Sequence, residues 1–130
     1  MYFSESLKKN HQFQTVYKNG VSRANKYFIM YIMENGTEGN RVGISVSKKV
    51  GNSVVRHRVT RLVRESYRLH ENMFNSGLDM VIIARPGAAA VGYKEVESAL
   101  LHLCRIHHIC REDYEKDPSA DEQNMYKEKI

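Results

Sequence analysis

The hydrophobic positions between residues 41 and 69 follow two periods in turn, which predict a strand and then a helix. In residues 41–46, every second side chain is Val or Ile and the intervening ones are Arg, Gly and Ser, as in a half-buried strand. Gly51 and Asn52 then provide a turn and a helix cap. Residues 53 to about 69 continue with a helical period, so we expect a strand that leads into an amphipathic helix.

This helix has one apolar face and one cationic face. At about 100° per residue, with Arg56 at zero, the apolar side chains fall between about 220° and 340° and the cationic ones between about 80° and 200°. The apolar face consists of Val55, Val59, Leu62, Val63 and Leu69. The opposite face consists of His57, Arg58, Arg61, Arg64 and Arg68. We expect the first face to pack on the core and the second to meet a partner.

The remaining pattern predicts further elements on both sides of this stretch. They are an irregular lead-in (1–9), a helix (10–19), two strands (21–25 and 27–33), a hairpin loop (34–40), an apolar central strand (78–84) and a last amphipathic helix (93 to about 109). The first helix would be capped by Asn10 and ended by Gly20. Leu7 in the lead-in could still turn inward.

Together the elements predict an α+β fold, a two-layer α/β sandwich with the order α-β-β-β-α-β-α. The strands at 41–46 and 78–84 should be parallel, because a helix separates them, and chain sterics favour a right-handed crossover. The 130 residues suit a single domain. We expect residues 1–110 to form it and residues 111–130, with four basic and seven acidic side chains, to be a polar, acidic, disordered tail.

Positive charge is concentrated in residues 41–68, which carry a net charge of +7 against +5 for the whole chain. The cations of this stretch are Arg41, Lys48, Lys49, Arg56, Arg58, Arg61, Arg64 and Arg68. Glu65 is its only carboxylate. Like charges three or four apart destabilise a helix by about 0.2–0.5 kcal/mol per pair, so this clustering indicates a polyanionic partner rather than an ordinary solvated face. The guanidinium group of arginine can donate two hydrogen bonds to one phosphate, so the many arginines favour a nucleic-acid backbone as the partner.

The strand at 27–33 is apolar on both faces. Helices on one side of a sheet would bury only Phe28, Met30 and Ile32. The other face could combine with Phe13 and Tyr17 to form a groove in which aromatic rings stack on unpaired bases. The same residues could instead pack on one another as a second layer, and the sequence alone favours neither arrangement.

Cys104 and Cys110 fall six residues apart in the last expected helix, which separates them by roughly 9 Å of rise, too far for a disulfide within that helix. We expect both to be reduced and buried in a cytoplasmic protein. A metal site that also used His107 and His108 is disfavoured, because the spacing matches neither CxxC nor HExxH. The sequence has neither a secretion signal nor an apolar run long enough for a membrane span, so we expect no membrane contact.

Several of these segments resemble the bacterial ribonuclease P protein subunit over roughly residues 5 to 110. The matching segments are Phe13-Gln14-Thr15-Val16-Tyr17, the stretch Arg41 to Lys49, Gly51-Asn52, Arg56-His57-Arg58, Arg61-Leu62-Val63-Arg64 and the closing strand Asp79 to Arg85. The combination is specific, although each piece alone is weak. Three positions depart from the family pattern: His57 stands for an asparagine, Thr60 for a lysine and Tyr17 for a phenylalanine.

The resemblance implies a fold like the second domain of ribosomal protein S5, with a left-handed crossover. It also implies a partnership with a catalytic RNA, which removes the 5′ leader of precursor tRNA by Mg²⁺-dependent hydrolysis. By the same analogy, the catalytic RNA would be contacted by Lys48, Lys49, Asn52, Arg56, His57, Arg58, Arg61, Arg64 and Arg68. The single-stranded leader would lie in a groove formed by Phe13, Tyr17, Lys26, Tyr31 and Ser45.

The residues themselves argue that the protein has no catalytic residue of its own. Phosphodiester cleavage with Mg²⁺ requires clustered carboxylates, yet residues 39–78 contain only Glu65 and Glu71. Any Mg²⁺ would therefore act through the RNA. Two alternatives are a structural RNA-binding protein of ribosomal type, without a role in tRNA processing, and a DNA-binding regulator. We do not expect DNA as a partner, because no helix precedes residue 53 through a tight turn.

Overall fold

The computed structural model describes residues 4–110, which form three α-helices and a mixed five-stranded sheet. The elements in chain order are β1 (Ser4–Ser6), α1 (Asn10–Asn19), β2 (Val21–Ala24), β3 (Phe28–Glu34), β4 (Asn40–Ser45), α2 (Ser53–Leu69), the 3₁₀ turn η1 (Glu71–Met73), β5 (Leu78–Ala84), the 3₁₀ turn η2 (Pro86–Ala90) and α3 (Tyr93–Ile106). The expected α+β fold and the order of its main elements are confirmed. The expected tail at residues 111–130 lies outside the described residues.

The sheet has the strand order β1-β4-β5-β3-β2, with β5 in the centre. β5 pairs antiparallel with β3 over its whole length, and its other edge pairs in parallel with β4. The central place of β5 and its parallel partner were predicted correctly. The hairpin expected at residues 34–40 was wrong, because β3 and β4 are not neighbours. β5 lies between them, and there its nearly continuous apolar run is buried on both faces of the sheet.

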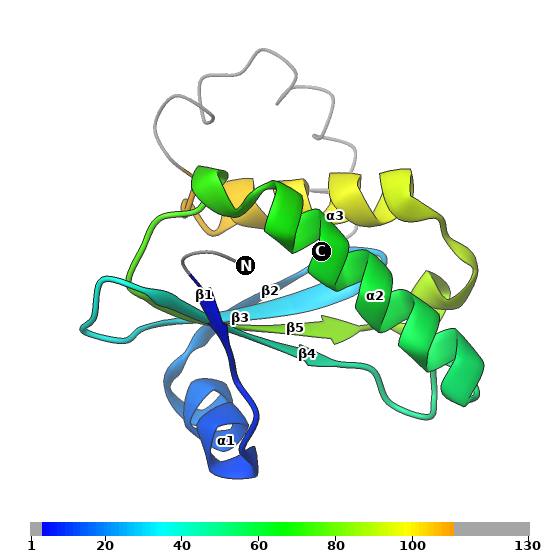
Figure 1. Cartoon of the computed structure of the whole chain (residues 1–130), viewed down its shortest axis with the longest axis horizontal. Helices are drawn as coiled ribbons and strands as arrows, with labels where there is room; N and C mark the ends of the chain where they lie inside the picture. Colours follow the sequence, from blue (N-terminus) through cyan, green and yellow to red (C-terminus); the bar gives the residue numbers. More distant parts are fainter. Residues whose placement is uncertain (1–3, 111–130) are drawn as a thin grey trace.

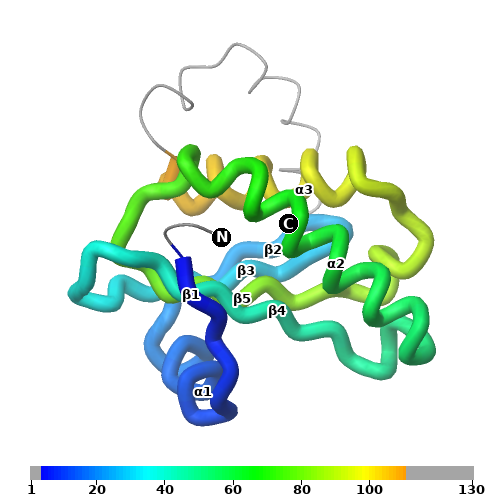
Figure 2. The backbone as a smooth tube through the Cα atoms, viewed as in Figure 1, coloured from blue at the N-terminus to red at the C-terminus, as the bar shows by residue number. Residues whose placement is uncertain are grey.

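The connection from β4 through α2 to β5 is left-handed. In Figure 1, β4 runs from left to right, α2 returns above the sheet, and β5 lies behind β4. The general steric preference for a right-handed crossover was therefore misleading, and the geometry implied by the family resemblance is correct. The tube in Figure 2 shows α2 and α3 together on one face of the sheet and α1 alone on the other.

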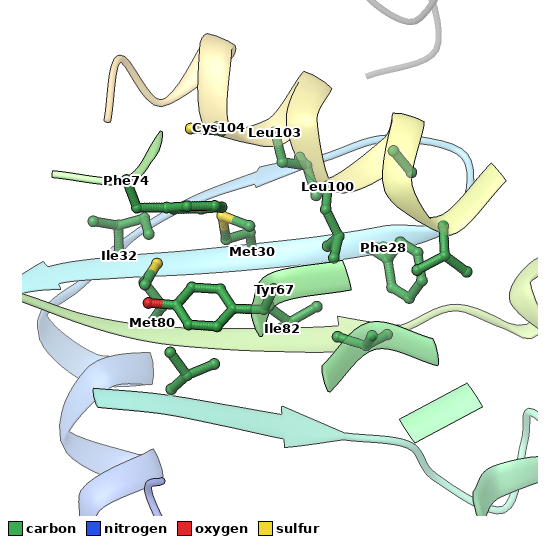
Figure 3. Close-up of a cluster of buried hydrophobic side chains, with 14 of the residues drawn as sticks. Phe28, Met30, Ile32, Tyr67, Phe74, Met80, Ile82, Leu100, Leu103 and Cys104 are labelled. Atoms are coloured by element: carbon green, nitrogen blue, oxygen red, sulfur yellow. The ribbon is translucent and has the colours of Figure 1, made fainter. Parts of the chain in front are cut away.

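The two faces of the sheet bury separate apolar clusters. The larger one lies beneath α2 and α3 and includes the side chains labelled in Figure 3, among them Phe28 and Met80 from the sheet and Tyr67 and Leu100 from the helices. The smaller one lies beneath α1 and is centred on Leu7, Val16 and Val81. The sandwich of sheet and two helices thus has a partial third layer, which α1 supplies.

The start of the chain is more regular than expected. Residues 4–6 form β1, which pairs in parallel with β4, so the expected irregular lead-in was wrong there. Leu7 is buried, as the sequence allowed. α1 has the expected bounds, but its N-cap is Lys9 rather than Asn10. The side-chain oxygen of Gln12 accepts hydrogen bonds from the backbone N–H groups of Lys8 and Lys9, which fixes this end of the helix.

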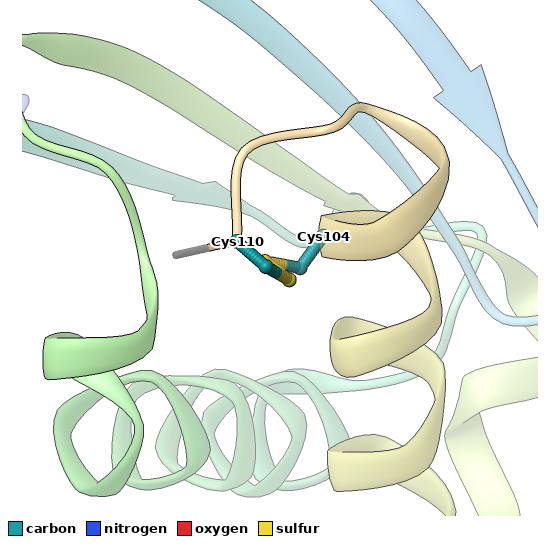
Figure 4. The surroundings of a disulfide bond; sticks show 2 residues. All are labelled: Cys104 and Cys110. Carbon is teal, nitrogen blue, oxygen red and sulfur yellow. A yellow bond between two sulfur atoms is a disulfide. The ribbon is translucent and has the colours of Figure 1, made fainter. Parts of the chain in front are cut away.

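Cys104 and Cys110 form a disulfide, contrary to the expectation that both are free (Figure 4). The expectation placed both cysteines in a last helix that runs to about residue 109, whereas α3 ends at Ile106. The chain then turns back through His108, whose φ of 57° lies in the left-handed region, and Ile109 N–H bonds to the Cys104 carbonyl. The turn brings the two Cα atoms to 5.6 Å, well within disulfide range.

Candidate RNA-binding surfaces

The cationic surface begins at the N-terminus of α2. Asn52 caps the helix, since its side-chain oxygen accepts a hydrogen bond from the Val55 N–H at 3.0 Å. The preceding loop leaves Lys48 and Lys49 exposed. No acidic residue lies in the first turn of α2, so nothing there neutralises the positive end of the helix dipole. This end of the helix therefore favours an anion.

Further along α2, the exposed cations surround two open hollows. His57, Arg61 and Arg64 line the first with Thr60, and its volume is about 430 Å³. His57 and Arg61 also line the second, of about 370 Å³, together with Ser53, Val54 and Arg58. Neither lining contains a carboxylate, so the charges of Arg61 and Arg64 are available to an external anion. We call His57, Arg61 and Arg64 the cationic face of α2.

Two other arginines of the basic stretch, Arg68 and Arg41, form ion pairs within the protein. Arg68 forms an ion pair with Glu65 at 2.5 Å, and this contact lowers the pKa of Glu65. Arg41, at 2.5 Å from the buried Asp79, forms a two-pronged ion pair across β4 and β5, and its hydrogen bonds to Asp79 raise the pKa of the guanidinium. No local spacing indicates the pairing of Arg41 with Asp79, because the two residues are distant in the chain.

Arg56 and Arg58 are half-buried rather than exposed. The Nε of Arg56 is buried without a hydrogen-bond partner among the described residues. Arg58 donates hydrogen bonds to the backbone carbonyls of Ala89 and Val91, in the connection between β5 and α3. These two side chains thus differ from the exposed cationic face, although all belong to the same expected site.

The apolar stripe of α2 is also narrower than predicted. Leu69 is 56% exposed, although the helical period placed it among the core residues. Its position at about 220° was the outermost edge of that stripe, where a residue of the last turn leaves the core. Val59 and Val63, nearer the middle of the stripe, are fully buried as expected.

A second candidate surface lies where α1 meets the sheet. The ring centroids of Phe13 and Tyr17 are 6.4 Å apart, and those of Tyr17 and Tyr31 are 5.1 Å apart, edge to face. All three rings are half-buried. Burial raises the pKa of Tyr17, and a hydrogen bond with the Ser45 side chain opposes this shift. The rings therefore pack on one another, as one of the two arrangements considered from the sequence expects, and keep part of their surface exposed. A groove in which they stack on unpaired bases stays a prediction.

Lys26 is placed differently from the rest of the expected leader groove. It lies in the turn between β2 and β3, where its Nζ stands 5.5 Å from the centroid of the Tyr27 ring. Within residues 4–110, ring contacts and a side-chain hydrogen bond join Phe13, Tyr17, Tyr31 and Ser45, and Lys26 takes part in none of them. We call these four residues the leader face.

Among residues 4–110, the structure brings together no three His, Cys, Asp or Glu side chains that could hold a metal ion. Within the same residues, none of the helices has the length and apolar character that a membrane crossing needs.

The fold and the basic helix define an RNA-binding α+β protein of the type found in the second domain of ribosomal protein S5. A family model described as Ribonuclease P matches residues 1–108. The chain is 61% identical to the ribonuclease P protein component of Lachnoclostridium phytofermentans over 82% of this chain and 91% of the relative. It is 56% identical to that of Alkaliphilus metalliredigens over 81% and 95%.

Solved structures agree with these matches. The RNase P protein of Staphylococcus aureus superposes with a TM-score of 0.75 at 36% identity, covering 80% of this chain and 95% of that one. The RNase P protein from Thermotoga maritima gives a TM-score of 0.71 at 32% identity, covering 76% and 94%. The chain belongs to the bacterial ribonuclease P protein family, and is thus one component of a ribonucleoprotein endoribonuclease that processes tRNA. This membership sets aside the ribosomal and DNA-binding alternatives.

Proposed function

We propose that this protein binds the catalytic RNA of ribonuclease P through the cationic face of α2 and its preceding loop, and the 5′ leader of precursor tRNA through the leader face. Lys48, Lys49, Asn52, Arg56 and Arg68 would complete the contact with the RNA. The observation that carries the proposal is the pair of hollows around His57 and Arg61, which are lined by cations and by no carboxylate.

The leader face suits a single strand for a different reason. Tyr17 and Tyr31 present half-open rings from two elements, α1 and β3, and Ser45 adds a hydroxyl beside them. Stacking of a base on an aromatic ring contributes about 1–3 kcal/mol and tolerates any base. A surface of this kind can hold leaders of different sequence, as a processing enzyme with many tRNA substrates requires.

We assign the Mg²⁺-dependent hydrolysis to the RNA subunit and infer that the complex acts in the cytoplasm on precursor tRNA. Two carboxylates close to the basic arginines support this assignment, because Glu65 and Asp79 are already engaged by Arg68 and Arg41. The protein would contribute affinity and position, and the RNA would hold the metal ions.

The leader contact is tested by replacing Tyr17 with Leu or with Phe in the reconstituted holoenzyme. Tyr17→Leu removes the ring, whereas Tyr17→Phe keeps the ring and loses only the hydroxyl. We expect Leu to reduce the preference for leader-bearing over mature tRNA by about tenfold, equivalent to one lost stacking contact, and Phe to retain most of it. Equal preference in all three proteins would refute a leader contact at this ring.

A further inference from the structure

Arg58 differs from the other cations of α2 because its guanidinium is engaged within the protein. Its Nη1 donates a hydrogen bond to the Ala89 carbonyl at 3.1 Å, and its Nη2 donates one to the Val91 carbonyl. Two separate nitrogen atoms thus reach two separate backbone acceptors. His57 and Arg61, one turn or less away, are exposed, and neither donates such hydrogen bonds to the backbone within residues 4–110.

The acceptors belong to the connection between β5 and α3. Ala89 lies in η2, a short turn of sequence PGAAA, and Val91 is the C-cap of that turn, two residues before α3 begins at Tyr93. Carbonyls at the end of a 3₁₀ turn lack partners within the turn, and alanine and glycine side chains cannot supply them. The guanidinium fork of Arg58 therefore satisfies two backbone oxygens that η2 cannot satisfy itself.

The hydrogen bonds of Arg58 join the N-terminal half of α2 to the connection between β5 and α3. Figure 1 shows the N-terminal half of α2 extending past the end of the sheet, and η2 is the element that packs against it there. The same end of α2 carries Lys49 in its preceding loop and His57 and Arg61 on its exposed side. Ser45 of the leader face ends β4, only a short loop before this helix begins.

From these contacts we propose that Arg58 is a positioning residue and not a phosphate ligand. It clamps the N-terminal half of α2 to the connection between β5 and α3, and so fixes the cationic face relative to the leader face. This inference rests on the proposed function of both surfaces. The catalytic RNA and the leader belong to one complex, so a small displacement between the surfaces that hold them misplaces the substrate.

The substitution Arg58→Lys distinguishes a positioning residue from a phosphate ligand. A lysine at residue 58 keeps the positive charge but has one ammonium group, which cannot span two carbonyls as a planar fork does. A phosphate contact would survive Arg58→Lys in large part, whereas the clamp would fail as it does in Arg58→Met. The same pair of substitutions at Arg61, which is exposed, provides the matched comparison, and Arg23→Met on β2 controls for loss of one charge.

The clamp itself is tested in the free protein by amide hydrogen exchange. We expect Arg58→Lys and Arg58→Met to exchange about tenfold faster than the unmodified protein over residues 86–96, since a charged hydrogen bond is lost. The Arg61 variants should leave these amides unchanged. Unchanged exchange in both Arg58 variants would overturn the clamp, whatever the RNA measurements show.

The positioning role is tested in the holoenzyme, at a temperature where circular dichroism shows every variant folded. Both Arg58 variants should lose about tenfold or more of the preference for leader-bearing tRNA, with an unaltered salt dependence of catalytic RNA binding. Arg61→Met should instead make the salt slope less negative by about 0.7–0.9, and Arg61→Lys should restore it. If Arg58→Lys behaves as unmodified protein and Arg58→Met loses salt slope, Arg58 is a phosphate ligand and the inference fails. A flat salt slope in the unmodified protein would instead count against the proposed function.

Discussion

The ring of Phe13 in α1 lies directly against Gly43 in β4. A Cβ atom at Gly43 would stand 2.6 Å from two ring atoms of Phe13 and 3.2 Å from the Cβ of Leu7. The absence of a side chain at this one position therefore lets α1 approach the sheet closely. Since α1 also carries Tyr17, the same contact sets the distance between Tyr17 and Tyr31 on the leader face.

We therefore expect Gly43→Ala to destabilise the protein by about 1–3 kcal/mol, because an added methyl group has no room in this contact. Urea unfolding measures the change. Gly87→Ala is the matched control, since the nearest atom to a Cβ there is 3.6 Å away, an ordinary contact. Equal unfolding midpoints for the two variants would show that α1 can shift away from the sheet at no cost.

Reduction of the Cys104–Cys110 disulfide should destabilise the protein. The bond closes a short loop that follows α3, and chain-entropy arguments assign a loop of this size about 2 kcal/mol. The measurement is urea unfolding with and without dithiothreitol. A double variant, Cys104→Ala with Cys110→Ala, should be insensitive to the reductant. A midpoint that does not move in the unmodified protein would mean that the two thiols are not paired in solution.

His107 should make the stability fall at acid pH. Its Nε2 lies 2.8 Å from the Met30 carbonyl, and burial, together with the nearby charges of Arg23 and His108, lowers the pKa of the ring below 6.5. As the pH falls below about 6.5, the unfolded chain binds a proton that the folded protein still refuses, so the free energy of unfolding decreases. Above that pH the stability is fully present.

The variant His107→Gln keeps a side chain that can bond to the Met30 carbonyl but removes the titration. We expect it to lose less stability than the unmodified protein between about pH 7.5 and pH 5.5. His11→Gln is the matched control, because His11 is exposed on α1 and does not contribute to the shift at His107. If His107→Gln shows the same pH dependence of stability as the unmodified protein, the buried His107 ring is not the cause of the loss of stability at acid pH.

Local patterns in the sequence were sufficient for most elements of the fold. The alternation in β4 and the helical period of α2 depend only on which side chains face the core, so both were predicted with nearly correct bounds. The positions of His57, Arg61 and Arg64 on one exposed face followed from the same period.

Features that depend on contacts distant in the chain could not be predicted in this way. The placement of β5 between β3 and β4 and the pairing of β1 with β4 arise from competition among whole strands. The pairs Arg41–Asp79 and Arg58–Val91 join residues more than thirty positions apart, and no local spacing indicates them. The disulfide was missed because its formation depends on where α3 ends, and helix ends are set by capping and tertiary contacts.

The central claim is that the cationic face of α2 holds the phosphate backbone of the catalytic RNA. The most direct measurement is the salt dependence of binding to that RNA, between about 50 and 200 mM salt, for the unmodified protein and for the double variant Arg61→Met with Arg64→Met. We predict a steep negative slope that becomes less negative by about 1.4–1.8 in the double variant, equivalent to two lost phosphate contacts. A flat slope, or the same slope in both proteins, would contradict the account.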